Sequence, residues 1–398
     1  MSDTRVTAVI LAAGEGRRLA PLTNRRPKPM MPVANRPRRR LRRRIRVAAG
    51  IDRIVLVVGY RQERIRNHFG DGDDWGVPIE YVEQPTQLGT GHAVLQAAPV
   101  VDEPFVVLNG DRIVDASIVA RVRDRVRDGD TPVMTVTTVD RPREYGVVTL
   151  DGTRLIGIDE KPAGPVATNR INAGVYGFST DVFDAIRETR VTGEQTIPAT
   201  LDDLAATDGG VTAVSYEGRW LDVSNLWDVL SVNAALVYDR NSTAAADADG
   251  DTGRVRGDSE TIAEDVALAD TVRVGPNVTI GGATAVGSNA TIGANAVVEN
   301  AVVFPDAVIE AGGVVRDAVV AGNATIGANA TVAGGSATVV VGDAVHHDVT
   351  LGGVVGDNAI VGSGATLTDG AVVGDNVRAD AGVVIDGRIE SGAVVRRG

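Results

Sequence analysis

The chain has 398 residues, which suggests two or three domains, and it has no cysteine, which excludes disulfide bonds, thiolate metal sites and a thiol nucleophile. Hydrophobic residues make up 43% of the chain and charged residues 23%, a balance typical of globular proteins. No segment reaches the roughly 18 apolar residues of a membrane helix, and the N-terminal apolar run is too short for a signal peptide, so we expect a soluble cytoplasmic protein.

The charge is unevenly distributed along the chain. Residues 1–240 hold 32 acidic and 32 basic side chains, so the net charge of −12 falls on residues 241–398. Of the 40 basic residues only two are lysines, Lys28 and Lys161. High acidity with almost no lysine is the composition expected of adaptation to high salt. The two remaining lysines are therefore candidates for a function that arginine cannot perform.

Residues 1–240 alternate short β-rich runs with helical patterns, which predicts an α/β domain. The predicted strands are residues 6–11, 54–58, 79–82, 105–108, 133–139 and 211–216. The predicted helices include residues 117–127 and 181–190. Several strands are continuous runs of Val, Ile and Leu, as in strands buried on both faces, so we expect a Rossmann-like, mixed but mostly parallel sheet.

The pattern changes after residue 240. Residues 241–260 contain almost no large apolar side chain and are predicted to be a linker. In residues 261–398, aliphatic residues recur at every sixth position, with Gly, Asn or Asp at the turns between them. The aliphatic positions are Val274, Ile280, Val286, Ile292 and Val298, then, after a slip, Val320, Ile326 and Val332, and finally Val355, Val361, Leu367 and Val373. A period of six residues predicts a β-helix with one inward aliphatic side chain on each flat face.

A glycine-rich turn follows the first predicted strand. Gly14 and Gly16 would let backbone N–H groups approach a phosphate, and Arg17 and Arg18 add positive charge. The turn is neither the three-glycine dinucleotide fingerprint nor a P-loop, so on its own it is a weak signal. Beyond it, prolines on both sides of Lys28 are expected to hold this lysine in an extended segment and restrict its ammonium group.

Longer motifs are more specific. Residues 11–33, LAAGEGRRLAPLTNRRPKPMMPV, resemble the N-terminal signature of the sugar-1-phosphate nucleotidylyltransferases. This family includes glucose-1-phosphate uridylyl- and thymidylyltransferases, which join a nucleoside triphosphate to a sugar phosphate and release pyrophosphate. Further segments that agree in order are residues 83–93, 108–111, 144–146, 159–162, 172–176 and 220–223. The match covers about residues 5–240. An appended hexapeptide-repeat, left-handed β-helix also recurs in the family, and the composition is of the haloarchaeal type.

The resemblance implies a role for each matched residue. The implied nucleotide-binding residues are Leu11, Ala12, Ala13, Gly14 and Gly16, with Gln84, Gly89 and Thr90 at the base. The implied catalytic cations are Arg18 at the outer phosphates, Lys28 near the reacting phosphates and Lys161 at the sugar phosphate. The implied sugar-binding residues are Gly146, Glu160 and Asn172.

Two aspartates are candidate metal ligands. Asp111 ends a buried strand and Asp222 follows a β-rich run, so carboxylates that meet there could hold Mg²⁺ against a triphosphate. Such a metal would help to bring two polyanions together, which is the main task of phosphoryl-group transfer. By itself, an aspartate in such a place could equally be a loop residue or a helix N-cap. The resemblance implies that both are metal ligands and that Mg²⁺ is the cofactor.

The sequence also departs from the family pattern. Arg17 stands where the family usually has a small hydroxyl residue, and Ser224 and Asn225 stand where Gly-Thr is usual. Residues 36–46 contain eight arginines, whereas relatives have a mixed helix there. This run could form an amphipathic helix with a basic surface, or a site for a polyanion or nucleotide effector. It has no interleaved aromatic residues, so nucleic-acid binding is not predicted.

The β-helix of bifunctional relatives is an acetyltransferase with a histidine base. Here the candidate bases are the adjacent His346 and His347, and no Lys, Trp or Tyr follows Tyr238. We therefore expect a structural role for the β-helix, with association into trimers or other homo-oligomers through its flat faces.

The predicted function is Mg²⁺-dependent transfer of UMP or dTMP from UTP or dTTP to a hexose 1-phosphate, with glucose 1-phosphate as the first candidate. One alternative is a bifunctional hexosamine-1-phosphate uridylyltransferase and acetyltransferase. Another is a non-catalytic regulatory relative that binds sugar nucleotides, although the complete motifs argue against it. The nucleotide and the sugar are not fixed by the sequence, because base and hydroxyl contacts use backbone and common polar groups. No membrane partner is predicted.

Overall fold

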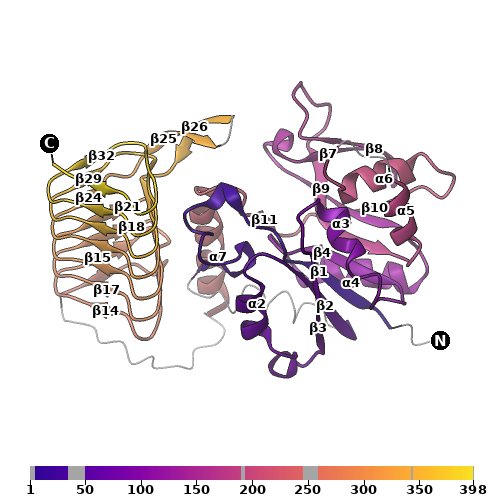
Figure 1. Ribbon diagram of the computed structural model, residues 1–398, viewed down its shortest axis with the longest axis horizontal. Helices are drawn as coiled ribbons and strands as arrows, with labels where there is room; N and C mark the ends of the chain where they lie inside the picture. Colours follow the sequence, from indigo (N-terminus) through magenta and orange to yellow (C-terminus); the bar gives the residue numbers. More distant parts are fainter. Residues whose placement is uncertain (1–4, 35–49, 190–192, 245–258, 342–343, 398) are drawn as a thin grey trace. The chain divides into compact units, whose positions relative to one another are not determined.

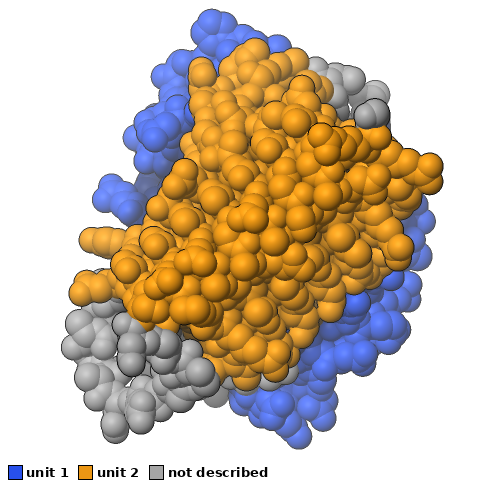
Figure 2. Space-filling model, turned by 90° about the vertical axis from the view of Figure 1, so that its left-hand side faces the viewer, with its two compact units in different colours: residues 1–15, 27–29, 38–222 blue, residues 16–26, 30–37, 223–398 orange. Residues whose placement is uncertain are grey.

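The computed structural model describes residues 5–34, 50–189, 193–244, 259–341 and 344–397 (Figure 1). Contacts between residues divide the chain into two compact units, which Figure 2 distinguishes by colour. Unit 1 comprises residues 1–15, 27–29 and 38–222, and unit 2 comprises residues 16–26, 30–37 and 223–398.

Neither unit is one continuous piece of chain. Two short N-terminal segments, residues 16–26 and 30–37, belong to unit 2 together with the long C-terminal stretch from Val223. The sequence-based domain ranges, 1–240 and 261–398, stay predictions. The predicted linker 241–260 lies mostly outside the described residues, and the arginine-rich run 36–46 lies wholly outside them.

Among the described residues, unit 1 contains a nine-stranded sheet in the order β3-β2-β1-β4-β9-β6-β10-β8-β7. Its strands are β1 (Thr7–Leu11), β2 (Arg53–Val58), β3 (Ile79–Glu83), β4 (Phe105–Asn109), β6 (Val133–Thr138), β7 (Gly146–Asp151), β8 (Arg154–Glu160), β9 (Arg170–Phe178) and β10 (Thr212–Ser215). Strands β3, β2, β1 and β4 are parallel, and β10 is parallel to β6. Strand β9 runs antiparallel to both β4 and β6. The sheet is therefore mixed, with its longest parallel part at the β3 end.

The six predicted strands correspond to β1, β2, β3, β4, β6 and β10, so these predictions are confirmed. All side chains from Ile54 to Val58 in β2 are buried, as expected of a strand covered on both faces. Strands β7, β8 and β9 were not predicted. Gly174 and Gly177 interrupt the apolar run of β9, and glycine weakens the pattern of a strand.

Helices cover both faces of this sheet. They are α2 (Gln62–Phe69), α3 (Thr90–Leu95), α4 (Ala116–Arg127), α5 (Val182–Glu188) and α6 (Ile197–Ala205). Tyr176 and Phe178 of β9 share a hydrophobic core with residues of α3, α5 and α6. A Cβ on the intervening Gly177 would instead meet Val122 and Val126 of α4. Because successive side chains alternate across a strand, α4 lies on the opposite face.

In its described residues, unit 2 contains three parallel seven-stranded sheets, which form the predicted left-handed parallel β-helix. The first sheet has strands β12 (Thr261–Ile262), β15 (Thr279–Gly281), β18 (Val297–Glu299), β21 (Val314–Arg316), β24 (Thr331–Val332), β29 (Thr366–Leu367) and β32 (Val384–Ile385). The second has β13 (Ala267–Leu268), β16 (Ala285–Val286), β19 (Val302–Val303), β22 (Ala318–Val320), β27 (Gly353–Val355), β30 (Ala371–Val373) and β33 (Arg388–Ile389). The third has β14 (Arg273–Val274), β17 (Thr291–Ile292), β20 (Val308–Ile309), β23 (Thr325–Ile326), β28 (Ile360–Val361), β31 (Arg378–Ala379) and β34 (Val394–Val395).

The six-residue period corresponds to the three faces of each coil. The aliphatic residues it identified lie in one continuous core along the β-helix, with Val274 packed at its edge. The slip in the period arises because some coils are one residue shorter: Ile280 pairs with Val298, 18 residues on, whereas Val298 pairs with Val315, 17 residues on. A second interruption is the antiparallel hairpin of β25 (Ser336–Val341) and β26 (Ala344–Thr350), which projects from the stack (Figure 1).

A long helix, α7 (Asp228–Ala244), packs on the β-helix within unit 2. Val237 is fully buried against Ala267 and Ala285 of the second sheet. The side chain of Asn233 donates to the carbonyl of Ala283 at 2.5 Å and accepts from the backbone N–H of Ala34 at 2.8 Å. Asn233 thus ties the N-terminal segment 30–37 to the β-helix. No helix in the described parts of the chain combines the length and apolar character needed to cross a membrane.

Candidate active site

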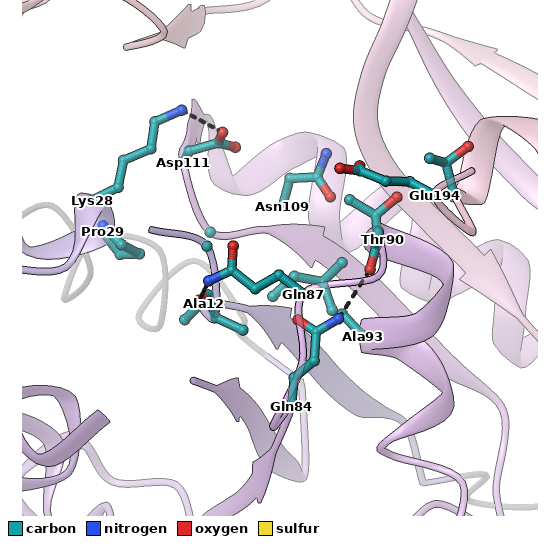
Figure 3. Close-up of a pocket in the computed structure, with 16 residues that line it drawn as sticks. Ala12, Lys28, Pro29, Gln84, Gln87, Thr90, Ala93, Asn109, Asp111 and Glu194 are labelled. Atoms are coloured by element: carbon teal, nitrogen blue, oxygen red, sulfur yellow. Dashed lines mark hydrogen bonds and ion pairs between the residues drawn. The ribbon is translucent and has the colours of Figure 1, made fainter. Parts of the chain in front are cut away.

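A cavity of about 270 Å³ lies in unit 1 at the carboxyl ends of β1, β3 and β4 (Figure 3). This edge is where parallel α/β sheets commonly bind ligands. The predicted site residues that line it are Leu11, Ala12, Ala13, Gly14, Lys28, Gln84, Gly89, Thr90 and Asp111. The fold therefore brings most of the predicted nucleotide-binding residues, one predicted catalytic lysine and one predicted metal ligand to the same cavity.

The turn after β1 is held by hydrogen bonds to its two neighbouring strands. The N–H of Ala12 donates to the carbonyl of Val57, and the N–H of Gly110 donates to the carbonyl of Leu11, both at 2.8 Å. A Cβ on Gly110 would collide with the same Leu11 oxygen. Only glycine therefore allows the chain after β4 to approach β1 this closely, which places Asp111 in the cavity wall.

Gln84 is fixed in place by the loop that follows it. Its side chain is buried, and Nε2 donates to the carbonyl of Gly89 at 3.1 Å (Figure 3). The same nitrogen lies 3.0 Å from Nδ1 of His92. His92 in turn has its Nε2 atom 3.2 Å from the amide nitrogen of Gln96. Because the amide nitrogen of Gln84 is committed to the loop, its oxygen is the group that this side chain can offer to a base.

The loop itself is held by the segment before α6. Gly89 has φ +108°, and a Cβ there would collide with the carbonyl of Gln195. Thr90 Oγ1 accepts a hydrogen bond from the N–H of Ile197 at 3.0 Å. Glu194 and Thr196, from the same segment, line the cavity opposite β1, and no motif in the sequence pointed to them.

Lys28 and Asp111 form an ion pair in the cavity. Lys28 Nζ lies 2.7 Å from Asp111 Oδ2, and both side chains are partly buried (Figure 3). Lys28 begins a short 3₁₀ turn, Lys28–Met30, whereas its flanking prolines predicted an extended segment. The prediction was wrong here because Pro29, in the first turn of a helix, needs no N–H donor.

Arg112 joins the two aspartates and was missed by sequence reasoning. Its guanidinium contacts Asp222 through Nη1, and its Nε lies 3.8 Å from Asp111 Oδ1. The backbone brings these residues together, because Arg112 of β5 (Arg112–Val114) is directly opposite Asp222 of β11 (Trp220–Asp222). Asp222 is not among the residues that line the cavity, and its side chain is only 1% exposed. The one available signal was the position of Arg112 immediately after Asp111.

Two neighbouring aromatic rings pack against the Arg112 guanidinium. Its central carbon lies 4.9 Å from the ring centre of Trp220 and 5.4 Å from that of Tyr145, distances typical of cation–π contacts. Trp220 Nε1 donates to the carbonyl of Ala173 at 2.8 Å. Burial alone would lower the pKa of Arg112, but the charges of Asp222 and Asp111 raise it more, so Arg112 stays a cation. Arg112 thus contacts residues of three separate motifs, in residues 108–111, 144–146 and 220–223.

The donor set of this region fits a divalent metal ion. Asp111 and Asp222 offer carboxylate oxygens, the ligands that Mg²⁺ prefers. Within the described ranges, no group of three or more acidic, histidine or cysteine side chains could hold a metal ion. Oxygens of a bound triphosphate would therefore have to complete the coordination, as is common for Mg²⁺. In the structure, Lys28 forms an ion pair with Asp111 and Arg112 forms one with Asp222.

The predicted sugar-binding residues gather on neighbouring strands outside the lining of this cavity. Gly146 of β7 pairs with Glu160 of β8, and a Cβ on Gly146 would come within 2.7 Å of Glu160 Oε2. Asn172 of β9 donates to the hydroxyl of Tyr176 at 2.8 Å. Lys161 follows Glu160 and has a positive φ of 50°, which directs the chain sharply away from β8.

The phenol of Tyr176 in β9 is buried beside predicted site residues. Burial raises the pKa of Tyr176, the hydrogen bond from Asn172 and the charge of Arg112 lower it, and the charges of Glu160 and Asp111 raise it.

The remaining candidates lie in unit 2. Gly16 has φ +69° and precedes the short 3₁₀ helix Arg17–Leu19, in which Arg18 is exposed. The ring of His346 packs 4.9 Å from that of Trp227, and His347 on the same hairpin strand is exposed.

Comparison with known proteins finds separate family matches for the N-terminal and C-terminal parts of the chain. The family described as nucleotidyl transferase matches residues 7–238, and the GMPPB C-terminal domain matches residues 262–352. A Bifunctional protein GlmU of Methanococcus aeolicus is 35% identical over 235 residues, which cover 58% of this chain and 54% of the relative. A glucose-1-phosphate thymidylyltransferase of Streptomyces antibioticus is 34% identical, over 58% of this chain and 66% of the relative.

Two further similarities extend the comparison. The low-salt glycan biosynthesis nucleotidyltransferase Agl11 of Haloferax volcanii is 34% identical over 58% of this chain and 66% of that protein. A crystal structure described as a glucose-1-phosphate thymidylyltransferase of Bacillus anthracis superposes with a TM-score of 0.53 at 25% identity, covering 58% of this chain and 94% of the other. The match therefore spans little more than half of the GlmU relative. Because the family match covers more than half of the present chain, the protein belongs to the nucleotidyl transferase family.

Proposed function

We propose that this protein transfers a nucleoside monophosphate from UTP or dTTP to a hexose 1-phosphate, most simply glucose 1-phosphate, and releases pyrophosphate. The observation that carries the proposal is the cavity at the ends of β1, β3 and β4, in which the glycine turn, Gln84 and the Lys28–Asp111 ion pair meet. This arrangement offers contacts for a base at one end and charge for phosphates at the other.

The reaction joins two anions, so charge neutralisation is the main requirement. A phosphate oxygen of the sugar phosphate attacks the α-phosphorus, a new P–O bond forms, and the bond from that phosphorus to the α,β-bridging oxygen breaks. Lys28 would stabilise the negative charge on the α-phosphate as the bond order changes. Its compact ammonium group lies in the cavity, where a planar guanidinium would need more space. Arg18 would bind the departing pyrophosphate.

The metal ion is proposed to be Mg²⁺, held by Asp111 and Asp222. When bound, it would neutralise the triphosphate and bring the two substrates into line. Asp111 lines the cavity directly, while Asp222 is buried and paired with Arg112. The aspartates and the two cations together keep the site close to electroneutral before substrates bind.

Gln84 supports a base that carries a ring N–H. Uracil and thymine carry one, which the amide oxygen of Gln84 can accept, whereas cytosine has an acceptor at that position. Guanine carries a ring N–H as well, so this contact favours UTP or dTTP over CTP but does not distinguish them from GTP. The backbone of Gly89 and Thr90 supplies the neighbouring polar contacts. The sugar 1-phosphate is assigned to the β7–β8–β9 region, with Glu160 and Asn172 at the hydroxyls and Lys161 at the phosphate.

We also propose that the β-helix forms homo-oligomers through its flat faces. Ile360 of β28 and Val394 of β34, which both lie in the third sheet, are 44% and 57% exposed, and apolar side chains exposed on one flat face favour association. Sedimentation velocity should show an oligomer, and a monomer at micromolar concentration would contradict this assignment.

The direct test is pyrophosphate release from UTP or dTTP with glucose 1-phosphate and Mg²⁺. Asp111→Asn should lower turnover by at least about 1000-fold, because the variant loses a metal ligand and the partner of Lys28. Asp74→Asn, at an exposed acidic residue of unit 1, is the matched control and should retain wild-type turnover. Equal turnover in the two variants would rule out the role of Asp111.

A further inference from the structure

The segment that carries Arg18 is anchored on the β-helix. Residues 16–26 belong to unit 2, and Arg26 at their end contacts two coils of the solenoid. Arg26 Nη2 lies 2.5 Å from Asp357 Oδ1, and the guanidinium carbon lies 4.7 Å from the ring centre of Phe304. Both partners are buried, and only 16% of the Arg26 side chain is exposed.

The adjacent side chains make the same kind of contact. Asn24 donates from Nδ2 to Asp375 Oδ2 at 2.8 Å, and Arg25 donates to Asn376 Oδ1 at 3.0 Å. Three successive residues of the segment are therefore bonded to the β-helix through their side chains.

The two aspartates are built into one corner of the β-helix. Asp357 Oδ1 accepts the N–H of Gly322 at 3.0 Å, and Asp375 Oδ1 accepts the N–H of Asp357 at 2.8 Å. Backbone hydrogen bonds repeat at this corner from coil to coil. The carbonyls of Ser288, Pro305, Gly322, Asp357 and Asp375 accept from the N–H groups of Asp306, Asn323, Asn358, Asn376 and Gly392, respectively. Aspartate thus stands on two successive coils, which are those that Asn24 and Arg26 reach.

Burial makes the carboxylate of Asp357 dependent on Arg26. Asp357 and Asp375 are each only 4% exposed, and a buried carboxylate is costly unless a cation or several donors satisfy it. Arg26 supplies that cation from a segment 331 residues away in sequence. The buried carboxylates at this corner of the β-helix therefore serve to bind residues 24–26.

We propose that the β-helix positions the phosphate-binding segment, and that Asp357 and Asp375 are positioning residues for nucleotidyl transfer. The proposal rests on the function given above. The anchored residues lie between Arg18 and Lys28 in the chain, so fixing them limits the conformations of both cations. Arg18 itself is exposed and makes a charge available to phosphates. The β-helix thereby contributes to the reaction without touching a substrate.

Steady-state kinetics provide the first test. Asp357→Asn keeps the acceptor for Gly322 but removes the charge opposite Arg26, so kcat/KM for the nucleoside triphosphate should fall between about 10- and 100-fold. Arg26→Ala should lower kcat/KM to the same extent. The double variant Asp357→Asn/Arg26→Ala should have a kcat/KM no lower than that of either single variant. Arg26→Lys keeps the positive charge and should retain most of the wild-type kcat/KM. Additive losses in the double variant would overturn the proposed coupling.

A matched control separates this effect from damage to the solenoid. Asp317 lies at another corner, where it accepts the N–H of Gly335 at 3.0 Å and the side-chain amide of Asn300 at 2.6 Å. Asp317→Asn should therefore leave kcat/KM unchanged. Equal losses in the Asp317→Asn and Asp357→Asn variants would show a general effect of the β-helix and contradict the proposal.

Hydrogen–deuterium exchange tests the anchoring independently of turnover. The N–H groups of Leu22 and Asn24 donate to Leu19 and Pro21, and should exchange faster in Asp357→Asn than in the wild type or Asp317→Asn. Unchanged exchange would overturn the proposal even in an active enzyme. If the wild type instead releases no pyrophosphate with any substrate pair, the proposed function fails, while the exchange result still decides whether the β-helix holds the segment.

Discussion

Arg112 places a positive charge between the two carboxylates that a metal ion would use. It contacts Asp222 directly, and the adjacent rings of Tyr145 and Trp220 pack against it. Such a cation has two opposing effects: it stabilises the buried Asp222 in the absence of metal, and it competes electrostatically with the metal for the same carboxylates. The residue therefore couples the stability of this region to its metal affinity.

Removing the Arg112 charge should separate these two effects. Arg112→Met keeps much of the side-chain volume but leaves Asp222 buried without its partner, so the free energy of unfolding should fall by about 3–5 kcal/mol without metal. Mn²⁺, used as a probe in calorimetry, should bind more tightly to the folded variant because a competing cation is gone. Weaker Mn²⁺ binding would show that Arg112 serves only to orient Asp222.

Lys28 provides a second test at the level of single residues. Lys28→Arg preserves the charge but replaces a compact ammonium group with a larger planar one in the wall of the cavity. We expect kcat to fall by about 100-fold or more, with a smaller change in KM, because the interaction matters most in the transition state. Arg64→Lys, at an exposed position of α2, is the converse control and should be neutral. A Lys28→Arg variant with wild-type kcat would contradict the assignment.

Among the secondary-structure elements, two glycines determine the shape of the cavity. Gly89 and Gly110 both lie where a Cβ would collide with a backbone carbonyl, of Gln195 and Leu11 respectively. Gly89→Ala and Gly110→Ala should each lower the free energy of unfolding by about 1–3 kcal/mol and raise the KM for the nucleotide, because the walls must move apart. Gly164→Ala, with nothing within 4 Å of the added Cβ, is the control for both measurements. Normal KM values in the two cavity variants would show that the walls adjust freely.

The sequence predicted the elements whose pattern is local. Continuous aliphatic runs identified β1, β2 and β4, and the six-residue period identified the core of the β-helix, because each pattern repeats within a few residues. The interruptions in that period come from shortened coils and the inserted β25–β26 hairpin, whose lengths follow no period.

The interactions that were missed join distant parts of the chain. Arg112 acquires its importance from Asp222 and Trp220, and Arg26 from Asp357, none of which is near it in sequence. For the same reason, no local pattern indicated that residues 16–26 belong to the unit that contains the β-helix. The family motifs predicted Lys28, the partner of Asp111, but not Arg112, the partner of Asp222.

For the whole molecule, the main feature is the acidic charge of residues 241–398, which is the origin of the net −12. Repulsion among these side chains destabilises the compact state, and dissolved salt screens it. The arginine-rich composition suits the same conditions, because a guanidinium is less strongly hydrated than an ammonium group.

The thermal midpoint should therefore rise from low salt to molar KCl. An uncharged osmolyte at the same osmolality should give a smaller rise, since it does not screen charge. Differential scanning calorimetry measures both. A midpoint that does not change with KCl would show that the acidic surface carries no net repulsion.

The most direct test of the central claim measures both products of the reaction at once. Purified protein is incubated with UTP or dTTP, glucose 1-phosphate and Mg²⁺, and pyrophosphate and nucleotide sugar are quantified by mass spectrometry in the same samples. Nucleotidyl transfer predicts one pyrophosphate for each nucleotide sugar, and no pyrophosphate without the sugar phosphate. Pyrophosphate released with free UMP or dTMP, or no product across a panel of nucleotides and sugar 1-phosphates, would contradict it.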